Sequence, residues 1–125
     1  MNKVLKVLVL LPALLFIVTG IRWLFAPAGV APNFGMSLEQ GLGLSTQVGD
    51  LAAFFLTLGA CMLIALVSGR RSWYYPAIML LSIAAVGRVL AWLLHDAALA
   101  PDMIGVELVV SAILLLASRR LTEQD

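Results

Sequence analysis

Residues 51–94 read LAAFFLTLGACMLIALVSGRRSWYYPAIMLLSIAAVGRVLAWLL, in which the short polar segment Gly69–Ser72 separates two long apolar runs. A helix that crosses a membrane needs about 20 mostly apolar residues. The two runs, residues 48–67 and 73–94, are each long enough for one crossing. Because the connection between them is so short, we expect two antiparallel helices that are neighbours.

Two further apolar runs flank this pair, at residues 4–25 and 104–117. The segment at residues 26–47 is rich in Gly, Pro, Ser and Asn, yet it keeps scattered apolar side chains. We expect it to form an interfacial loop with a short helix that begins at Pro27, since proline suits the first turn of a helix. The sequence thus predicts an all-α fold, with residues 1–125 forming a single transmembrane domain built as a four-helix bundle.

The composition of the whole chain is typical of a membrane protein. Of its 125 residues, 62% are hydrophobic and 12% are charged, and the mean hydropathy is +1.05. Soluble domains contain about 25% charged residues. The net charge of +1 gives no reason to expect nucleic-acid binding. The single cysteine, Cys61, excludes an internal disulfide and any CxxC motif, and one histidine with scattered carboxylates gives no metal-ligand spacing. We therefore expect no metal and no other cofactor.

The distribution of basic residues predicts the orientation. Six of them lie near span ends on one side of a four-span protein: Lys3, Lys6, Arg70, Arg71, Arg119 and Arg120. Basic residues favour the cytoplasmic side, so we expect both termini in the cytoplasm. An alternative is that the N-terminal run is a signal peptide cleaved near Ala26–Ala28. The length of that run and the presence of Arg22-Trp23 ahead of the site argue against cleavage.

Four ionisable residues lie inside or at the ends of the apolar runs: Arg22, Asp50, Arg88 and Glu107. Each belongs to a different predicted helix, and in the predicted topology all four fall toward the non-cytoplasmic face. An ionisable side chain in hydrocarbon is costly, so it is normally paired or lines a wet cavity. We therefore expect these residues to form one cluster of ion pairs or a ligand site.

Two interpretations of this cluster remain open. In the first, each charge complements the dipole of its helix, and the ion pairs fix which helices are neighbours. In the second, Arg88 faces an outward-opening pocket and binds an anionic or polar head group, while Asp50 and Glu107 hold its guanidinium or relay protons. Trp92 and His95 are accessory candidates, the former for stacking on Arg88 and the latter for proton transfer.

Small residues recur at every fourth position of the second predicted helix: Gly49, Ala53, Thr57, Cys61 and Ala65. Such a ridge lets the backbones of membrane helices approach closely. We expect the ridge to be buried against another helix, either in the same subunit or in a second copy. The second case would make a homo-oligomer through this helix.

Short motifs in a fixed order connect the chain to a known group: Gly20-Ile21-Arg22-Trp23, the Pro27–Gly35 loop, Gly49-Asp50, Gly87-Arg88 and Glu107. The chain resembles an uncharacterised bacterial family of four-helix membrane proteins in the DoxX-like superfamily. The resemblance implies a multi-pass protein of the bacterial inner membrane. Relatives in the superfamily are linked to quinone-coupled oxidoreductase complexes, usually as cofactor-free subunits. The resemblance thus implies a lipid or quinone ligand, or a membrane oxidoreductase partner.

The function that we expect is that of a binding or accessory subunit. Its outward-facing polar pocket around Arg88 would take a lipid, a quinone or part of a partner protein. The alternative is a small proton-coupled transporter, although the small multidrug-resistance proteins carry their essential carboxylate in the first helix, where this chain has no acid. We do not expect an enzyme, because no nucleophile elbow, phosphate loop or catalytic triad is visible.

Overall fold

The computed structural model describes residues 2–122, and every regular element within them is a helix. The four long helices are α1 (Asn2–Phe25), α3 (Leu42–Ser68), α4 (Tyr74–His95) and α5 (Pro101–Arg120). All four are long and apolar enough to cross a membrane. The prediction of an all-α fold with four long apolar helices is therefore confirmed.

The helices extend beyond the apolar runs. α3 begins at Leu42, inside the segment that was expected to be loop, and α5 runs to 20 residues where the apolar run covers only residues 104–117. The short helix α2 (Pro27–Val30) has its proline in the first turn, as predicted, and the 3-10 helix η1 (Ala31–Phe34) follows it directly. A second 3-10 turn, η2 (Arg71–Trp73), leads into α4.

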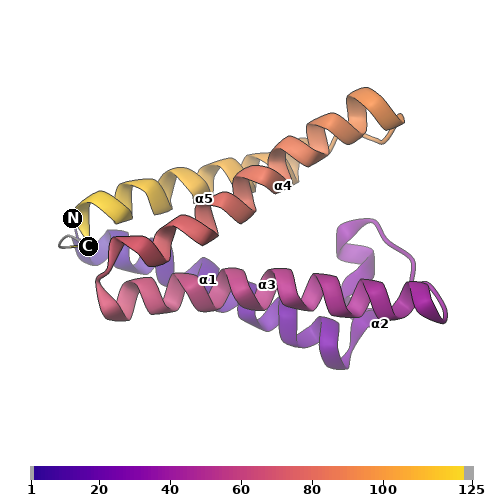
Figure 1. Ribbon diagram of the computed structural model, residues 1–125, viewed down its shortest axis with the longest axis horizontal. Coiled ribbons are helices and arrows are strands. Elements are labelled where there is room, and N and C mark those ends of the chain that lie inside the picture. The colour runs from indigo at the N-terminus through magenta and orange to yellow at the C-terminus, as the bar shows by residue number, and fades with distance from the viewer. Residues whose placement is uncertain (1, 123–125) are drawn as a thin grey trace.

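Gly69 makes the tight turn that ends α3. Its φ of 68° lies in the left-handed region, and its N–H donates to the carbonyl of Ala65 at 3.0 Å. Glycine adopts this conformation without the steric penalty that a β-carbon would bring. The chain therefore reverses at once, and α4 runs antiparallel to α3, as the short connection predicted (Figure 1).

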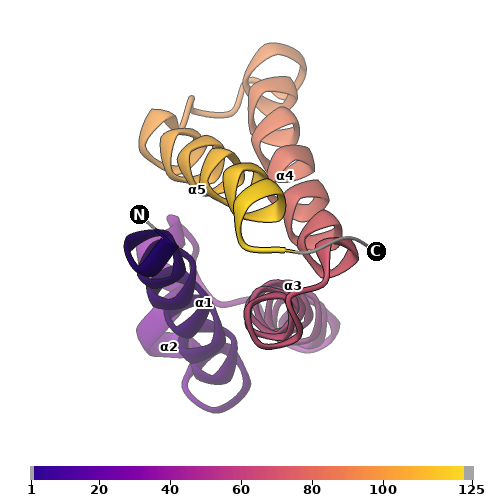
Figure 2. The same ribbon diagram turned by 90° about the vertical axis from the view of Figure 1, so that its left-hand side faces the viewer.

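The long helices form two pairs, in which α1 packs along α3 and α4 packs along α5. All four meet at the end that holds both chain termini and the α3–α4 turn, which we call the terminal end (Figure 1). The pairs separate toward the opposite end, the loop end, where the α1–α3 and α4–α5 connections lie. Figure 2, which views the molecule from the terminal end, shows the two pairs facing each other. The space between the pairs is where a site would form.

Two glycines bring α1 and α3 close together. A β-carbon at Gly59 would lie 2.5 Å from Cγ1 of Ile17 and 2.8 Å from the carbonyl oxygen of Ala13. A β-carbon at Gly20 would lie 2.6 Å from Cγ of Leu56. Real side chains do not approach this closely, so a side chain at either position would force its neighbours to shift. The α1–α3 pair is thus built on small-residue packing, the usual device of membrane helices.

The predicted ridge of small residues is buried over only part of its length. Cys61 and Ala65 are buried, but Gly49, Ala53 and Thr57 are exposed. The expectation that the whole ridge packs against another helix of the same subunit is therefore wrong. The reason is rotation: α3 turns the side that carries Leu56 and Gly59 toward α1 and leaves the Ala53–Thr57 side open.

The α4–α5 pair has a regular seam. Its buried residues recur at spacings of three and four along each helix, as expected for two helices packed side by side. On α4 they are Tyr74, Ala77, Leu81 and Ala85, and on α5 they are Glu107, Val110, Leu114, Ala117 and Ser118. At the terminal end Arg71 Nε adds a hydrogen bond of 2.9 Å to the carbonyl of Ser118. At the loop end the seam finishes on a charged residue.

The outside of the molecule is apolar on all four helices. Leu15, Ile83 and Val109, for example, are 63%, 66% and 59% exposed. Soluble monomers rarely present apolar surface on this scale. Together with the length of the four helices, this surface indicates a multi-pass membrane protein.

Candidate functional site

A pocket of about 340 Å³ lies between the two helix pairs, and its lining includes Arg88 and Asp102, which lie in the loop-end halves of α4 and α5. We call it the Arg88 pocket. Its lining comes from α1, η1, α3, α4 and α5: Phe16, Asn33, Phe34, Phe54, Phe55, Leu81, Arg88, Asp102, Met103, Val106 and Glu107. Its volume lies within the range of small-molecule sites, which are mostly apolar with a few placed polar groups.

Four phenylalanines form one side of the pocket, which we call the aromatic wall: Phe16, Phe34, Phe54 and Phe55. The ring centroid of Phe55 lies 5.2 Å from that of Phe34, 5.0 Å from that of Phe54 and 6.0 Å from that of Phe16. These distances fall within the range of favourable aromatic pairs. The wall is therefore a connected cluster of rings that holds its shape by its own contacts.

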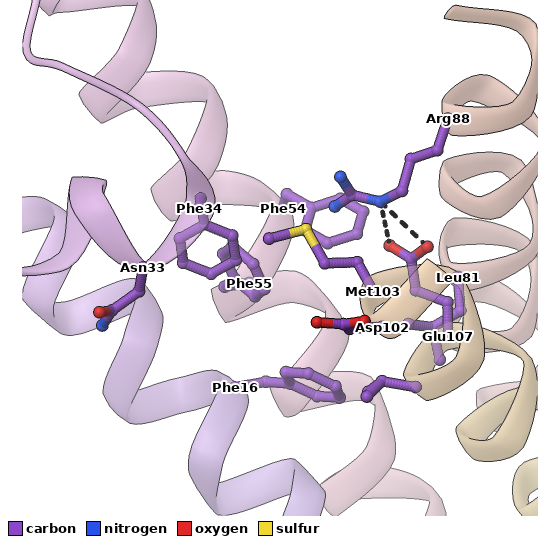
Figure 3. Close-up of a pocket in the computed structure, with 11 residues that line it drawn as sticks. Phe16, Asn33, Phe34, Phe54, Phe55, Leu81, Arg88, Asp102, Met103 and Glu107 are labelled. Atoms are coloured by element: carbon purple, nitrogen blue, oxygen red, sulfur yellow. Dashed lines mark hydrogen bonds and ion pairs between the residues drawn. The ribbon is translucent and has the colours of Figure 1, made fainter. Parts of the chain in front are cut away.

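An ion pair between α4 and α5 faces the aromatic wall (Figure 3). Arg88 Nε donates to both carboxylate oxygens of Glu107, each at 3.1 Å. Figure 3 shows the two terminal nitrogens of Arg88 turned away from the carboxylate. They form no hydrogen bond within residues 2–122, so the guanidinium keeps donors available for another molecule.

The pair is unequally buried. The side chain of Glu107 is 9% exposed and that of Arg88 is 33% exposed. Arg88 precedes the end of α4 by about 10 Å and Glu107 follows the start of α5 by about 9 Å, at 1.5 Å per residue. Glu107 is thus a buried carboxylate neutralised by its partner, while Arg88 reaches from the pair into the pocket.

The connection between α1 and α3 closes one edge of the pocket, because η1 contributes Asn33 and Phe34. Two side chains hold this connection in place. Arg22 Nη2 donates to the carbonyl of Gly29 at 3.0 Å. Gln47 accepts the N–H of Glu39 at 2.8 Å, and it donates to the carbonyl of residue 37 at 3.1 Å. The loop is therefore tied to both helices that it joins.

The four predicted charges do not form one cluster. Arg88 and Glu107 come together, but Arg22 is used on the loop carbonyl of Gly29 and does not line the pocket. Asp50 is exposed on α3 and forms no ion pair within the described part of the chain. The physical reason is again rotation, since depth in the membrane does not determine which way a residue faces around its helix. The site is one ion pair.

The two accessory candidates also lie outside the pocket. Trp92 is 46% exposed, and among the described residues it makes no stacking contact with Arg88. His95 is exposed at the last residue of α4. Both side chains are exposed, so neither reaches the Arg88–Glu107 pair.

The sequence did not reveal the aromatic wall or the polar residues Asn33 and Asp102. The Phe54-Phe55 pair was visible, but phenylalanines inside an apolar run are usually packing residues. Asp102 lies in the first turn of α5, where an acidic residue is explained by the helix dipole alone. Only the folded chain places these residues opposite Arg88.

The pocket combines apolar surface with polar groups that could contact a bound molecule. It offers apolar and aromatic surface, a guanidinium with available N–H donors and two carboxylates. Within residues 2–122, no three His, Cys, Asp or Glu side chains are grouped so that they could hold a metal ion. No protein-family model, curated protein or solved structure matches the chain, so the site is interpreted from its own geometry.

Proposed function

We propose that this protein is an integral membrane binding or accessory subunit, and that its Arg88 pocket holds the polar head of an otherwise apolar ligand, a lipid or a quinone. One observation carries the proposal: Arg88 is fixed by Glu107 and still presents unused N–H donors to a pocket whose opposite side is aromatic. A role in architecture alone would require the pair, but neither the pocket nor the unused donors.

The membrane topology is part of the proposal. The six basic residues of the prediction lie in α1, in α5, in η2 or just before it, and these segments meet at the terminal end: Lys3, Lys6, Arg70, Arg71, Arg119 and Arg120. This agrees with a cytoplasmic terminal end, and the Arg88 pocket would then open toward the non-cytoplasmic side. The choice of the bacterial inner membrane, like that of a quinone or an oxidoreductase partner, rests on the resemblance to DoxX-like proteins.

The geometry favours binding over proton-coupled transport. A transporter needs a carboxylate that reaches water from both sides in turn, whereas Glu107 is buried and paired with Arg88. Asp50 lies outside the pocket. The pocket therefore contains no carboxylate that is both deeply placed and unpaired, within the part of the chain that the structure describes.

The proposal is tested by native mass spectrometry of the protein released from mild detergent. The parent should retain an apolar molecule that is lost from the double variant Arg88→Met with Glu107→Gln. The matched control is Asp50→Asn with Arg119→Met, which removes one charge of each sign at exposed positions outside the pocket. Equal retention by all three proteins would refute a site at Arg88.

The topology is tested separately by fusions to alkaline phosphatase, which is active only outside the cytoplasm. A fusion after Asp96, at the loop end, should be active, and a fusion after Arg71, at the terminal end, should be inactive. The opposite result would place the Arg88 pocket on the cytoplasmic side.

A further inference from the structure

The charges that line the Arg88 pocket do not balance. One guanidinium, that of Arg88, faces two carboxylates, those of Glu107 and Asp102. The formal charge of the lining is therefore −1. Glu107 takes up the nearest donor of Arg88, and no second basic residue lines the pocket. A ligand with a full negative charge would enter a site whose only cation is already neutralised and whose lining carries a second carboxylate.

The hydrogen-bonding capacity is unbalanced in the opposite direction. A guanidinium carries five N–H donors, of which the Glu107 carboxylate uses the one on Nε. The four on the terminal nitrogens are turned away from Glu107 (Figure 3). These N–H groups can donate to an oxygen atom of a ligand, whereas the negative charge of the lining disfavours a ligand that is an anion.

The rest of the lining is apolar. The aromatic wall, with Leu81, Met103 and Val106, surrounds the space in front of Arg88. Aromatic rings prefer offset or edge-to-face contact with other flat rings, at centroid distances of about 4.5–7 Å. A flat, apolar body is therefore the shape that this side of the pocket accommodates best.

Taken together, the geometry points to one ligand class, and we propose that the Arg88 pocket selects an uncharged ring compound that carries an accepting carbonyl oxygen. The carbonyl oxygen accepts hydrogen bonds from the terminal N–H groups of Arg88, and the ring lies against the aromatic wall. This inference rests on the proposed binding function and narrows it. It excludes anionic head groups, such as carboxylates and phosphates, as the preferred partner of Arg88.

Asp102 acts as the residue that discriminates by charge. It is exposed in the first turn of α5 and lines the same pocket as Arg88, so its carboxylate repels an anion that binds there. An uncharged carbonyl compound meets no such repulsion. A lipophilic cation would be attracted by Asp102 but repelled by the terminal nitrogens of Arg88.

The test uses four naphthalene probes of nearly equal shape, titrated into the purified protein in detergent. They are 2-acetylnaphthalene (an uncharged acceptor), 2-ethylnaphthalene (no acceptor), 2-naphthoate (an anion) and 2-naphthylmethylammonium (a cation). Binding is taken as the difference between the parent and the Arg88→Met with Glu107→Gln variant, which cancels partition into the micelle. We expect the acetyl probe to bind at least about tenfold more tightly than the ethyl probe, because only its carbonyl oxygen accepts a hydrogen bond from the charged guanidinium.

A second variant tests the part assigned to Asp102. Asp102→Asn should raise the affinity for naphthoate, relative to that for acetylnaphthalene, by roughly 3- to 10-fold. The control Asp50→Asn with Arg119→Met should keep the ranking of the parent, since neither residue lines the pocket. An unchanged ratio in Asp102→Asn would overturn the charge argument.

The outcomes separate this inference from the proposed function. If naphthoate or the ammonium probe binds most tightly, or if the acetyl and ethyl probes bind equally, the pocket binds ligands but the inference is wrong. If none of the four probes distinguishes the parent from the double variant, the inference is wrong, whereas the proposed function fails only if native mass spectrometry also shows equal retention by the parent and the double variant.

Discussion

Replacement of Gly59 by alanine tests the closest contact between α1 and α3. The added β-carbon would lie 2.5 Å from Cγ1 of Ile17, 2.8 Å from the carbonyl oxygen of Ala13 and 3.1 Å from the backbone nitrogen of Ile17. Two of these three atoms belong to the backbone of α1 and cannot rotate away. The helices must therefore move apart, and overpacking of this kind costs about 1–3 kcal/mol.

The same substitution at Gly49 is the matched control, because it lies on the same helix with nothing within 4 Å of the new β-carbon. Gly49→Ala should stabilise the protein by up to about 1 kcal/mol through helix propensity. Gly20→Ala should fall between the two. Its nearest contacts are side-chain atoms of Leu56, at 2.6 and 2.8 Å, which can move, although the backbone nitrogen of Leu56 lies at 3.0 Å.

The assay is reversible unfolding in mixed micelles with increasing dodecyl sulfate, followed by circular dichroism. It compares the free energies of unfolding of the three variants with that of the parent. The expected order of stability is Gly49→Ala, parent, Gly20→Ala, Gly59→Ala. A Gly59→Ala protein as stable as Gly49→Ala would show that α1 and α3 do not meet at this position, and the described helix pair would be refuted.

Three further predictions concern the charged residues and the exposed face of α3. Arg88→Met should lower the free energy of unfolding by about 2–4 kcal/mol, because Glu107 stays buried without a partner. Adding Glu107→Gln should bring the free energy of unfolding back to within about 1 kcal/mol of that of the parent, and additive losses in this double-mutant cycle would contradict the pair. Thr57→Leu and Asp50→Asn, both at exposed positions, should melt within about 0.5 kcal/mol of the parent, and a clear loss for Thr57→Leu would indicate that a second copy covers that face. Arg22→Met should remove the hydrogen bond to the Gly29 carbonyl in α2 and so speed proteolysis within residues 26–41. An unchanged rate of cleavage would show that this hydrogen bond does not hold the α1–α3 connection in place.

The sequence placed Arg88 and Glu107 in one group of four charges because it supplies depth in the membrane. The linker between the two helices is short, and both residues lie at nearly the same number of turns from it. A carboxylate and a guanidinium at equal depth on neighbouring antiparallel helices are within reach of each other. Depth and the cost of an unpaired charge led to the predicted group, but only the structure shows that Arg88 pairs with Glu107 and not with Asp50.

The positions of Arg22 and Asp50 depend on how each helix is rotated about its axis, and the sequence pattern does not predict this rotation. A helix in water shows its inner face by an apolar stripe. α1 is apolar on every side, with both buried residues such as Val9 and exposed ones such as Leu15. The aromatic wall could not be predicted for the same reason, since phenylalanine occurs against lipid, in a core and at the edge of a pocket.

Because the two helix pairs meet at the terminal end and separate toward the loop end, a small rotation of one pair relative to the other would produce its largest displacement at the loop end. α4 has 22 residues, a length of about 33 Å, so a rotation of one pair by about 5° about that end would move the loop end by about 3 Å. Such a rotation leaves the contacts within each pair intact, because it changes only the angle between them. The width of the Arg88 pocket therefore depends on the angle between the pairs, which are joined at the α3–α4 turn around Gly69, far from any molecule that occupies the pocket. Substitutions there would alter affinity through the angle, without touching the ligand.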